Sequence, residues 1–351
     1  MTRRLIAALL ALTAVLSLAA CGEKSDNTGA PKVESLRLML DYLPNADHAG
    51  IYQAQGGGAF QAAGLKVDIQ TPSDPATPLK LLAAGKVDVA ISYEPEVFLA
   101  RDQGAKIVSI GALVQRPLTS LMAVPDKDKK GKETGVTSVR QLAGKTVGTA
   151  GIPYQSDYLK TILQQAGVDP SSVKEVNVGF NLVPAMLSGR ADATLGAFWN
   201  VEGVQLQREK RDPWILPVDQ AGVPTYDELV FAVREDTARY RGPVLRAFLR
   251  ALAQAHQQLR EDPENAIRPL LAANPDLDPD TTLAQVRRTL PAFFPSDPEQ
   301  PFGWQDGGAW GTYGNWMFEQ GLLKARPEPR TITNEYLPGA GLEKADEGTS
   351  G

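Results

Sequence analysis

The stretch that decides the fold is LAAGKVD at residues 82–88, because its pattern returns as MLSGRAD at residues 186–192. Each copy reads as the end of a helix, a glycine, a basic residue, a small apolar residue and an aspartate. A glycine directly after a helix is typical of a helix C-cap. Each copy then runs into an apolar segment that reads as a buried strand, 87–92 and 193–198. The repeat predicts two similar α/β lobes, with one copy in each.

Strands and helices alternate outward from both copies. This order predicts mostly parallel sheets that are covered by helices. The last third of the chain is expected to be helical, at 243–259 and 309–320. The expected strands are 35–40, 65–70, 87–92, 106–113, 145–149, 175–178 and 193–198, and the helices among them are 48–55, 77–84, 157–166 and 183–187.

Length and composition narrow the class of protein. The chain has 351 residues, which exceeds the about 250–300 residues at which a single core stops growing and so fits two lobes. Its 36 Lys and Arg residues do not outnumber its 41 Asp and Glu residues, so no basic excess favours nucleic acid as a partner. One cysteine and two histidines form no metal-binding motif, and H-E-x-x-H and G-x-S-x-G are absent. We expect a binding protein, not an enzyme, with no cofactor and no metal.

The N-terminus reads as an export signal with a lipid attachment site. An apolar run at 5–18 is shorter than the about 20 residues of a membrane-spanning helix. It ends in Leu-Ala-Ala-Cys at 18–21, which is similar to a bacterial lipobox, whose cysteine becomes the diacylated first residue of the mature protein. A plain signal peptide with an incidental Cys21 is the alternative. We expect residues 1–20 to be removed and 21–34 to form a tether from the bacterial cell membrane to an extracytoplasmic body.

Polar and aromatic residues follow several of the expected strands. In open α/β sheets ligands bind outside the carboxyl ends of the strands, and two such ends from two lobes would face each other. Tyr and Trp faces can sandwich a flat ring, while Glu and Asn edges can read its donors and acceptors. The alternative is that the aromatic residues only fill the interface between the lobes. The candidate ligand-binding residues are Asp41, Tyr42, Asn45, His48, Tyr93, Glu94, Tyr154, Trp199, Asn200 and Glu202.

Three segments carry a resemblance to a known family. They are LDYLPNADHAGIY at 40–52, GKVDVAISYEP at 85–95 and GAFWNVEG at 196–203. With these segments the chain resembles solute-binding proteins of ABC importers, and more narrowly the family that unites thiamine-pyrimidine synthase with bacterial pyrimidine-precursor binding proteins. The similarity runs from about residue 35 to 330. The second segment is shared more widely, with sulfonate and nitrate binders.

The resemblance implies a type II periplasmic-binding fold. One lobe would comprise 35–123 plus 231–338 and the other 124–230, with a loose tail at 339–351 and the hinge near Val124 and Val230. The implied partner is an ABC permease that reads the closed form, and the binder is expected to be a monomer. The implied ligand is a formylaminopyrimidine or hydroxymethylpyrimidine precursor of thiamine, held between Tyr42 and Trp199 and hydrogen-bonded by Asn45 and Glu202.

Two other functions stay open within the same resemblance. Some relatives resemble riboflavin binders, which would keep the fold and change the flat ligand. The synthase branch holds pyridoxal phosphate through a lysine and uses a histidine and a cysteine-rich iron motif. This chain has no second cysteine, and no lysine stands beside His48 in the pattern that the synthase needs. The resemblance therefore favours a binder over a pyridoxal phosphate enzyme.

Overall fold

The computed structural model describes residues 33–127 and 133–339. The chain divides into two compact units, residues 1–33 and 34–351, and the fold below is that of the second unit. The expected signal segment, Cys21, almost all of the expected tether and most of the expected tail lie outside the described residues. Within the described ranges, none of the helices combines the length and the apolar character that crossing a membrane requires.

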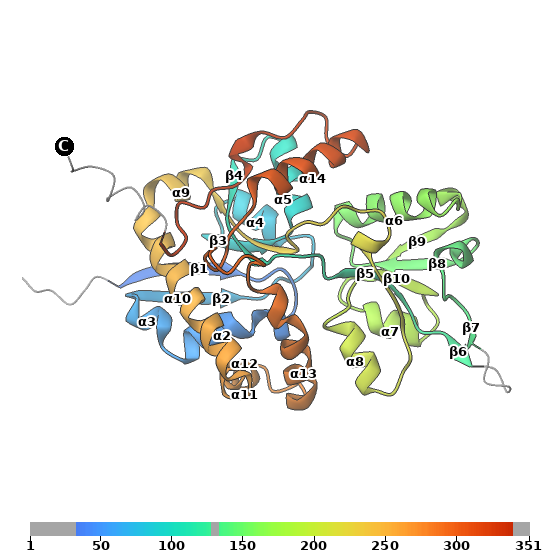
Figure 1. Cartoon of the computed structure of the whole chain (residues 1–351), viewed down its shortest axis with the longest axis horizontal. Helices are drawn as coiled ribbons and strands as arrows, with labels where there is room; N and C mark the ends of the chain where they lie inside the picture. Colours follow the sequence, from blue (N-terminus) through green and yellow to red (C-terminus); the bar gives the residue numbers. More distant parts are fainter. Residues whose placement is uncertain (1–32, 128–132, 340–351) are drawn as a thin grey trace, which may run out of the picture. The chain divides into compact units, whose positions relative to one another are not determined.

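The first of two large sheets has five strands in the order β2-β1-β3-β12-β4 (Figure 1). β1, β2 and β3 pair in parallel, and β12 pairs antiparallel with both of its neighbours. Four strands therefore point the same way and β12 runs against them. The strands are β1 (Glu34–Met39), β2 (Leu65–Gln70), β3 (Val89–Ser92), β4 (Ile107–Val114) and β12 (Leu229–Arg234).

Helices from both ends of the chain cover this sheet. The longest, α10 (Gly242–Glu261), turns an apolar stripe that includes Phe248, Leu252 and Leu259 into the core. It packs against α2 (Figure 1), and the ring of His256 fills the space that a side chain on Gly50 would need. The helices of this part are α2 (Ala49–Gly56), α3 (Ala59–Ala62), α4 (Pro78–Ala83), α5 (Glu94–Asp102), α9 (Glu235–Tyr240), α10, α11 (Pro263–Ala266), α12 (Arg268–Ala273), α13 (Pro279–Thr289) and α14 (Gly307–Glu319), with 3-10 turns η1 (Ala46–His48), η5 (Leu290–Ala292) and η6 (Pro329–Thr331).

The second sheet repeats the arrangement with the order β11-β5-β10-β8-β9. β8, β9 and β10 pair in parallel, and β5 runs against both of its neighbours. Its strands are β5 (Thr119–Ala123), β8 (Thr146–Thr149), β9 (Lys174–Asn177), β10 (Ala193–Phe198) and β11 (Trp214–Pro217). Its helices are α6 (Pro153–Gln165), α7 (Leu182–Leu187) and α8 (Glu202–Arg208), with η2 (Val139–Leu142), η3 (Pro170–Ser172) and η4 (Val218–Gln220), and a short pair β6 (Asp126–Lys127) and β7 (Glu133–Thr134) accompanies it.

The fold class predicted from the repeat is confirmed, since both halves are α/β and four of five strands in each sheet share one direction. The two copies of the repeat lead into β3 and β10, which are the third strands of their sheets. Gly85 and Gly189 both cap their helices with a positive φ, 69° and 72°. Asp88 accepts a hydrogen bond from the backbone N–H of Arg37 on β1, and Asp192 accepts one from that of Thr146 on β8, at 2.8 Å each. The aspartate thus links the start of the third strand to the first strand in both halves.

Several elements differ from the expectations. β5, β11 and β12 were not expected from the sequence, and β5 pairs in the second sheet although the expected lobe boundary at Val124 assigns it to the first. The connections between the sheets are therefore residues 115–118 and 221–228. Helix α6 begins at Pro153, four residues before the expected start, because proline fits the first turn of a helix, where its missing N–H leaves no bond unmade.

Replacing Asp88 with alanine will lower the free energy of unfolding by about 1.5–3 kcal/mol, the range for hydrogen bonds to a charged group. Asp88 also accepts from the Arg37 guanidinium at 3.0 and 3.1 Å and lies 3.4 Å from that of Arg241. Its counterpart Asp192 is more exposed and has the backbone bond plus Lys145 at 3.3 Å, so Asp192→Ala should cost less than about 1 kcal/mol. Urea unfolding of both variants measures this; equal losses would contradict it.

Candidate functional site

Side chains that follow strands of the two sheets meet at one junction. The carboxyl ends of β1 and β3 supply it from the first sheet, and those of β9 and β10 supply it from the second. Parallel strands place their carboxyl ends at one edge, which is where α/β proteins bind ligands. We call this the interlobe junction. Its residues are Asp41, Tyr42, Asp47, His48, Tyr93, Phe180, Asn200 and Glu202.

Asp41 is the centre of the first-sheet side of the interlobe junction. Its buried carboxylate accepts a hydrogen bond from the Tyr93 hydroxyl at 2.9 Å and one from Nε2 of His48 at 2.8 Å. Nδ1 of His48 accepts the backbone N–H of Asn45 at 3.2 Å, so the proton on the ring lies on Nε2. The bonds fix the direction of all three side chains, which come from β1, η1 and the turn before α5.

Tyr42 reaches from β1 to the loop after β9. Its ring packs edge-on against Phe180, with centroids 4.7 Å apart and planes at 81°, and its hydroxyl points at the carbonyl of Gly179, 3.4 Å away. Burial raises the pKa of Tyr42, and the charges of Glu202 and Asp41 raise it further. Tyr42 therefore lies among carboxylates from both sheets.

A buried polar bond joins Asp47 of η1 to Asn200, which follows β10. Nδ2 of Asn200 donates to Oδ1 of Asp47 and to the hydroxyl oxygen of Thr289, at 2.6 Å each. Oδ2 of Asp47 and Oδ1 of Asn200 are buried and have no partner among the described residues. Burial raises the pKa of Asp47 well above its usual range, and the nearby Asp41 carboxylate adds to this. The bond ties the two sheets together through a carboxyl group whose surroundings raise its pKa.

Glu202 turns back onto the end of β10. Its Oε2 accepts the backbone N–H of Phe198 at 2.7 Å, and burial raises its pKa to about 7. A bulge in β10 precedes this turn, at Gly196, whose φ is +115°. A side chain there would collide with the amide of Gln155, so only glycine fits. The bulge directs the end of β10 toward the interlobe junction.

Trp199 lies between Glu202 and the connection at 115–118. Its indole N–H donates to the carbonyl of Pro117 at 3.0 Å, and the guanidinium of Arg288 stands 5.4 Å from the centre of its ring. The hydrogen bond fixes the ring next to a segment that joins the two sheets. Trp199 is only partly buried, so part of its surface stays open for contact.

The structure places the other candidate residues around the interlobe junction or away from it. The side-chain amide of Asn45 is used locally, accepting from the N–H of Asp47 and donating to the carbonyl of Leu43. Tyr154 is buried with its ring 5.5 Å from that of Tyr93, so it lies behind the interlobe junction. Glu94 points elsewhere, because its Oε2 accepts the N–H of Asp227 at 2.7 Å and it lines a different cavity.

Three residues that the structure brings to this region are not among the candidates predicted from the sequence. Asp47 lies in the segment 40–52 that carries the family resemblance, but it is not one of the candidate ligand-binding residues. Thr289 ends helix α13, far along the chain. Phe180 follows strand β9, so the rule that placed the other candidates at strand ends would have found it. No strand-end pattern marks Thr289, because it arrives through tertiary packing of α13.

A buried glutamate holds the two connections together beside this region. The carboxylate of Glu228 accepts hydrogen bonds from the N–H groups of Leu118 and Thr119, at 2.6 and 2.8 Å, and from the hydroxyls of Thr119 and Tyr226, at 2.8 and 3.0 Å. Burial raises its pKa to about 7 in spite of these bonds. Both crossings are therefore fixed at one point.

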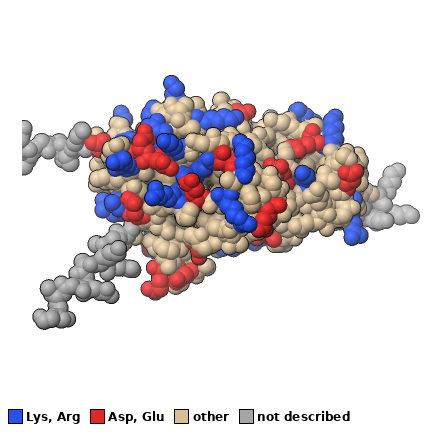
Figure 2. Space-filling model, turned by 90° about the horizontal axis from the view of Figure 1, so that it is seen from above, with Lys and Arg blue, Asp and Glu red and all other residues tan. Residues whose placement is uncertain are grey.

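No cluster of three or more His, Cys, Asp or Glu side chains suited to a metal ion is found within 33–127 and 133–339. Charged residues of both signs are interspersed over the face drawn in Figure 2, without a continuous basic patch. What the described residues offer at the interlobe junction is aromatic surface beside carboxyl and amide groups, which suits a small planar polar ligand.

Comparison with known proteins gives one family and a consistent fold. The family described as NMT1/THI5 like matches residues 45–266. The formylaminopyrimidine-binding protein of Halalkalibacterium halodurans is 35% identical over 87% of this chain and 91% of its own length. The 4-amino-5-hydroxymethyl-2-methylpyrimidine phosphate synthase of Legionella pneumophila is 29% identical over 73% of this chain and 79% of its own. The alkanesulfonate-binding protein of Xanthomonas axonopodis pv. citri, 18% identical, superposes with a TM-score of 0.64 and covers 85% of this chain and 98% of that one.

The protein should become less stable as the pH rises from 6 to 8. Burial raises the pKa of Glu96, Glu202, Asp227 and Glu228 to about 7. A carboxyl whose pKa is higher in the folded than in the unfolded chain binds its proton more tightly when folded. Its contribution to the free energy of unfolding is therefore present at low pH and lost as the pH rises through about 7.

Urea unfolding at both pH values measures the change in free energy. Glu202→Gln keeps an oxygen for the N–H of Phe198 but cannot titrate, so its loss between pH 6 and 8 should be smaller than that of the natural protein. A free energy of unfolding that is flat or rises over this range would contradict the prediction.

Proposed function

Because the chain belongs to the NMT1/THI5-like family, we propose that it is a small-molecule-binding protein that captures a flat pyrimidine at the interlobe junction. The observation that carries the proposal is the meeting of Asp41 and Tyr42 from one sheet with Asn200 and Glu202 from the other. A ligand held there contacts both sheets, and its binding favours the conformation in which they approach.

The chemistry of the interlobe junction suits an aminopyrimidine. Tyr42 in the interlobe junction, and Trp199 directly before Asn200, offer aromatic surface for the ring, whose amino group donates hydrogen bonds and whose ring nitrogens accept them. A protonated carboxylic acid offers one donor and one acceptor side by side, and an ionised one offers acceptors only. Glu202, with a pKa raised to about 7 by burial, can serve in either form near neutral pH. The formylaminopyrimidine-binding relative, 35% identical, supports this ligand class.

We place the protein outside the cytoplasm as the binding subunit of an ABC importer. The apolar run at 5–18 and the Leu-Ala-Ala-Cys motif ending at Cys21 support export and lipid attachment. A permease would distinguish the ligand-bound form by the closure of the lobes. The connections at 115–118 and 221–228, held by Glu228, are the segments about which the lobes would close.

A synthase activity is the competing proposal, because more distant relatives carry that name. Pyridoxal phosphate enzymes hold the cofactor through a lysine Schiff base. None of the residues that make up the interlobe junction is a lysine. This supports binding without chemistry, and a riboflavin-type ligand remains the alternative within the binding function.

The test is a thermal-shift screen of residues 22–351 with formylaminopyrimidine, hydroxymethylpyrimidine, riboflavin and pyridoxal phosphate. A ligand that binds only the folded protein raises the melting temperature. At a ligand concentration of one hundred times its dissociation constant, it stabilises the folded state by about 2.7 kcal/mol. We expect a shift with formylaminopyrimidine or hydroxymethylpyrimidine. A shift with riboflavin alone would change the proposed ligand from a pyrimidine to a flavin. A shift with pyridoxal phosphate alone would favour the synthase activity over the binding function.

Variants then locate the ligand in the same assay and by calorimetry. Trp199→Ala should weaken pyrimidine binding by about 1–3 kcal/mol, the scale of an aromatic anchor. Tyr240→Ala is the control, because Tyr240 is an exposed aromatic residue on α9. Unchanged affinity in Trp199→Ala would remove Trp199 from the site.

Replacing Cys21 with serine should release the protein from the membrane fraction of the cells that express it. The lipid is attached through a thiol, which serine lacks, and one or two acyl chains supply the membrane affinity. Fractionation and immunoblotting measure the distribution, with the natural protein as control. A variant that stays with the membrane would count against the lipid anchor.

A further inference from the structure

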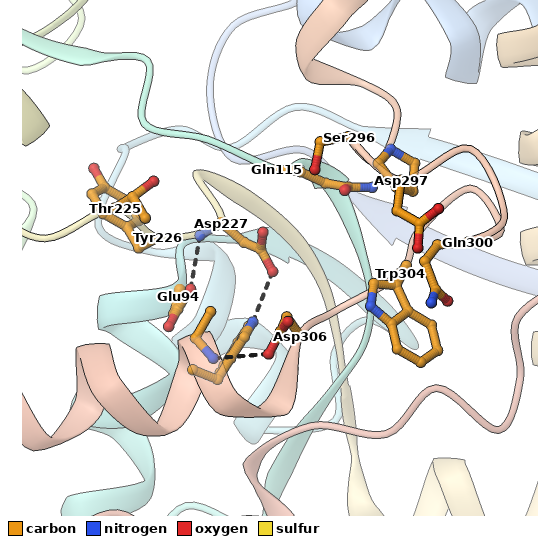
Figure 3. A pocket seen from close by; sticks show the side chains of 13 residues that line it. Glu94, Gln115, Thr225, Tyr226, Asp227, Ser296, Asp297, Gln300, Trp304 and Asp306 are labelled. Carbon is orange, nitrogen blue, oxygen red and sulfur yellow. Dashed lines mark hydrogen bonds between the residues drawn. The ribbon is translucent and has the colours of Figure 1, made fainter.

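A cavity of about 250 Å³ lies beside the two connections between the sheets (Figure 3). Gln115 from one connection and Thr225, Tyr226 and Asp227 from the other line it, so its wall includes both crossings between the sheets. Its remaining wall is Glu94, the loop at 295–306 and the first turn of α14. Glu94 lines this cavity, and none of the interlobe junction residues does. We call it the hinge cavity.

The described wall of the hinge cavity carries four carboxyl groups and neither lysine nor arginine. Asp297 and Asp306 each use Oδ1 to accept backbone N–H groups, from Glu299 and from Gly308 and Ala309. This leaves Oδ2 of each without a hydrogen-bond donor within the described part of the chain. Arg116 stands nearby but donates to the carbonyl of Pro291 and does not line the cavity.

Asp297 and Asp306 are exposed, whereas Glu94 is buried and gives the sign of a missing partner. Its side chain is 1% exposed, and its Oε1 has no hydrogen-bond partner among the described residues, while Oε2 accepts the N–H of Asp227. A buried carboxylate oxygen without a donor costs free energy, which a cation in the cavity would offset. Burial raises the pKa of Glu94, and it raises that of Asp227 to about 7 with the charge of Asp306 adding to it, so this wall favours a proton or a cation.

Aromatic side chains complete the hinge cavity. Trp304 lines it beside Asp297 and Gln300 (Figure 3), and Trp310 donates its indole N–H to Oδ2 of Asp227 at 2.7 Å. Tyr226 lines it from the connection. Aromatic faces next to carboxylates are the recognised surroundings of organic cations. The described residues offer no cluster arranged for a metal ion, which favours an organic cation over a metal.

We propose that the hinge cavity binds a small organic cation, an ammonium or guanidinium compound, through the carboxyl groups of Glu94, Asp227, Asp297 and Asp306 and the rings of Trp304 and Trp310. This site is separate from the interlobe junction and does not depend on the proposed pyrimidine ligand. Because the cavity wall includes both connections, a bound cation contacts the segments about which the lobes would move.

The test titrates the purified full-length protein with methylguanidinium chloride and with methylammonium chloride, at constant ionic strength kept by sodium chloride. Calorimetry and tryptophan fluorescence report binding, since two of the five tryptophans line the cavity. Asp306→Asn and Asp297→Asn are the test variants, because asparagine keeps the oxygen that accepts the backbone N–H groups and removes the charge. Asp278→Asn is the matched control, since Asp278 caps α13 in the same way by accepting the N–H of Thr281, away from the hinge cavity.

We expect saturable binding of at least one probe to the natural protein and to Asp278→Asn, and at least tenfold weaker binding to Asp306→Asn and Asp297→Asn. Melting curves of the variants confirm that they are folded. Absence of saturable binding to the natural protein would overturn the proposal. Equal binding to all variants would also overturn it, because it would show attraction to surface charge and not to the cavity. Pyrimidine binding by Asp306→Asn, measured in parallel, separates this outcome from failure of the proposed function.

Discussion

The interaction on which the arrangement of the two sheets depends is the buried carboxylate of Glu228. It accepts hydrogen bonds from Leu118 and Thr119 on one connection and from Tyr226 on the other, so two chain crossings share one anchor. A carboxylate is suited to this task because both of its oxygens accept hydrogen bonds, whereas a side-chain amide has only one accepting oxygen. Each crossing then leads directly into the one strand that runs against its sheet, β5 or β12. The reversal of one strand in each sheet follows from a chain that leaves one half, completes the other and returns.

The same constraint explains why polar groups are buried where the halves meet. With the crossings fixed, the carboxyl ends of the parallel strands face each other, and Asp41, Asp47 and Glu202 become neighbours at the interlobe junction. Burial raises the pKa values of Asp47 and Glu202, and the charges of Asp41 and Glu202 raise that of Asp47 further. Within 33–127 and 133–339, Oδ2 of Asp47 and Oδ1 of Asn200 have no hydrogen-bond partner, so the described residues do not fully satisfy this region. A polar ligand that donates hydrogen bonds would lower that cost.

The repeat in the sequence carried most of the fold, and the reason is physical. The glycine with positive φ and the aspartate lie three residues apart in both halves, between a helix and the next strand, so they leave a local signature at 82–88 and 186–192. The strands β5, β11 and β12 left none, because their pairing is decided by partners far along the chain. The strand-end rule likewise found Asp41, Tyr42, Asn200 and Glu202. It could not show that Asn45 is used up as a helix cap or that Thr289 would arrive from α13.

Tyr93 and Glu94 show how the interlobe junction and the hinge cavity are linked. They are adjacent at the start of α5, yet Tyr93 donates to Asp41 in the interlobe junction while Glu94 accepts the N–H of Asp227 in the hinge cavity. The backbone N–H of Glu94 also points at the carbonyl of Asp227, 3.4 Å away. A displacement of the connection at 221–228 is therefore transmitted to the turn that positions Tyr93. Coupling between two sites is reciprocal, so if a cation at the proposed hinge site changes the affinity for the proposed pyrimidine, the pyrimidine changes the affinity for the cation by the same factor.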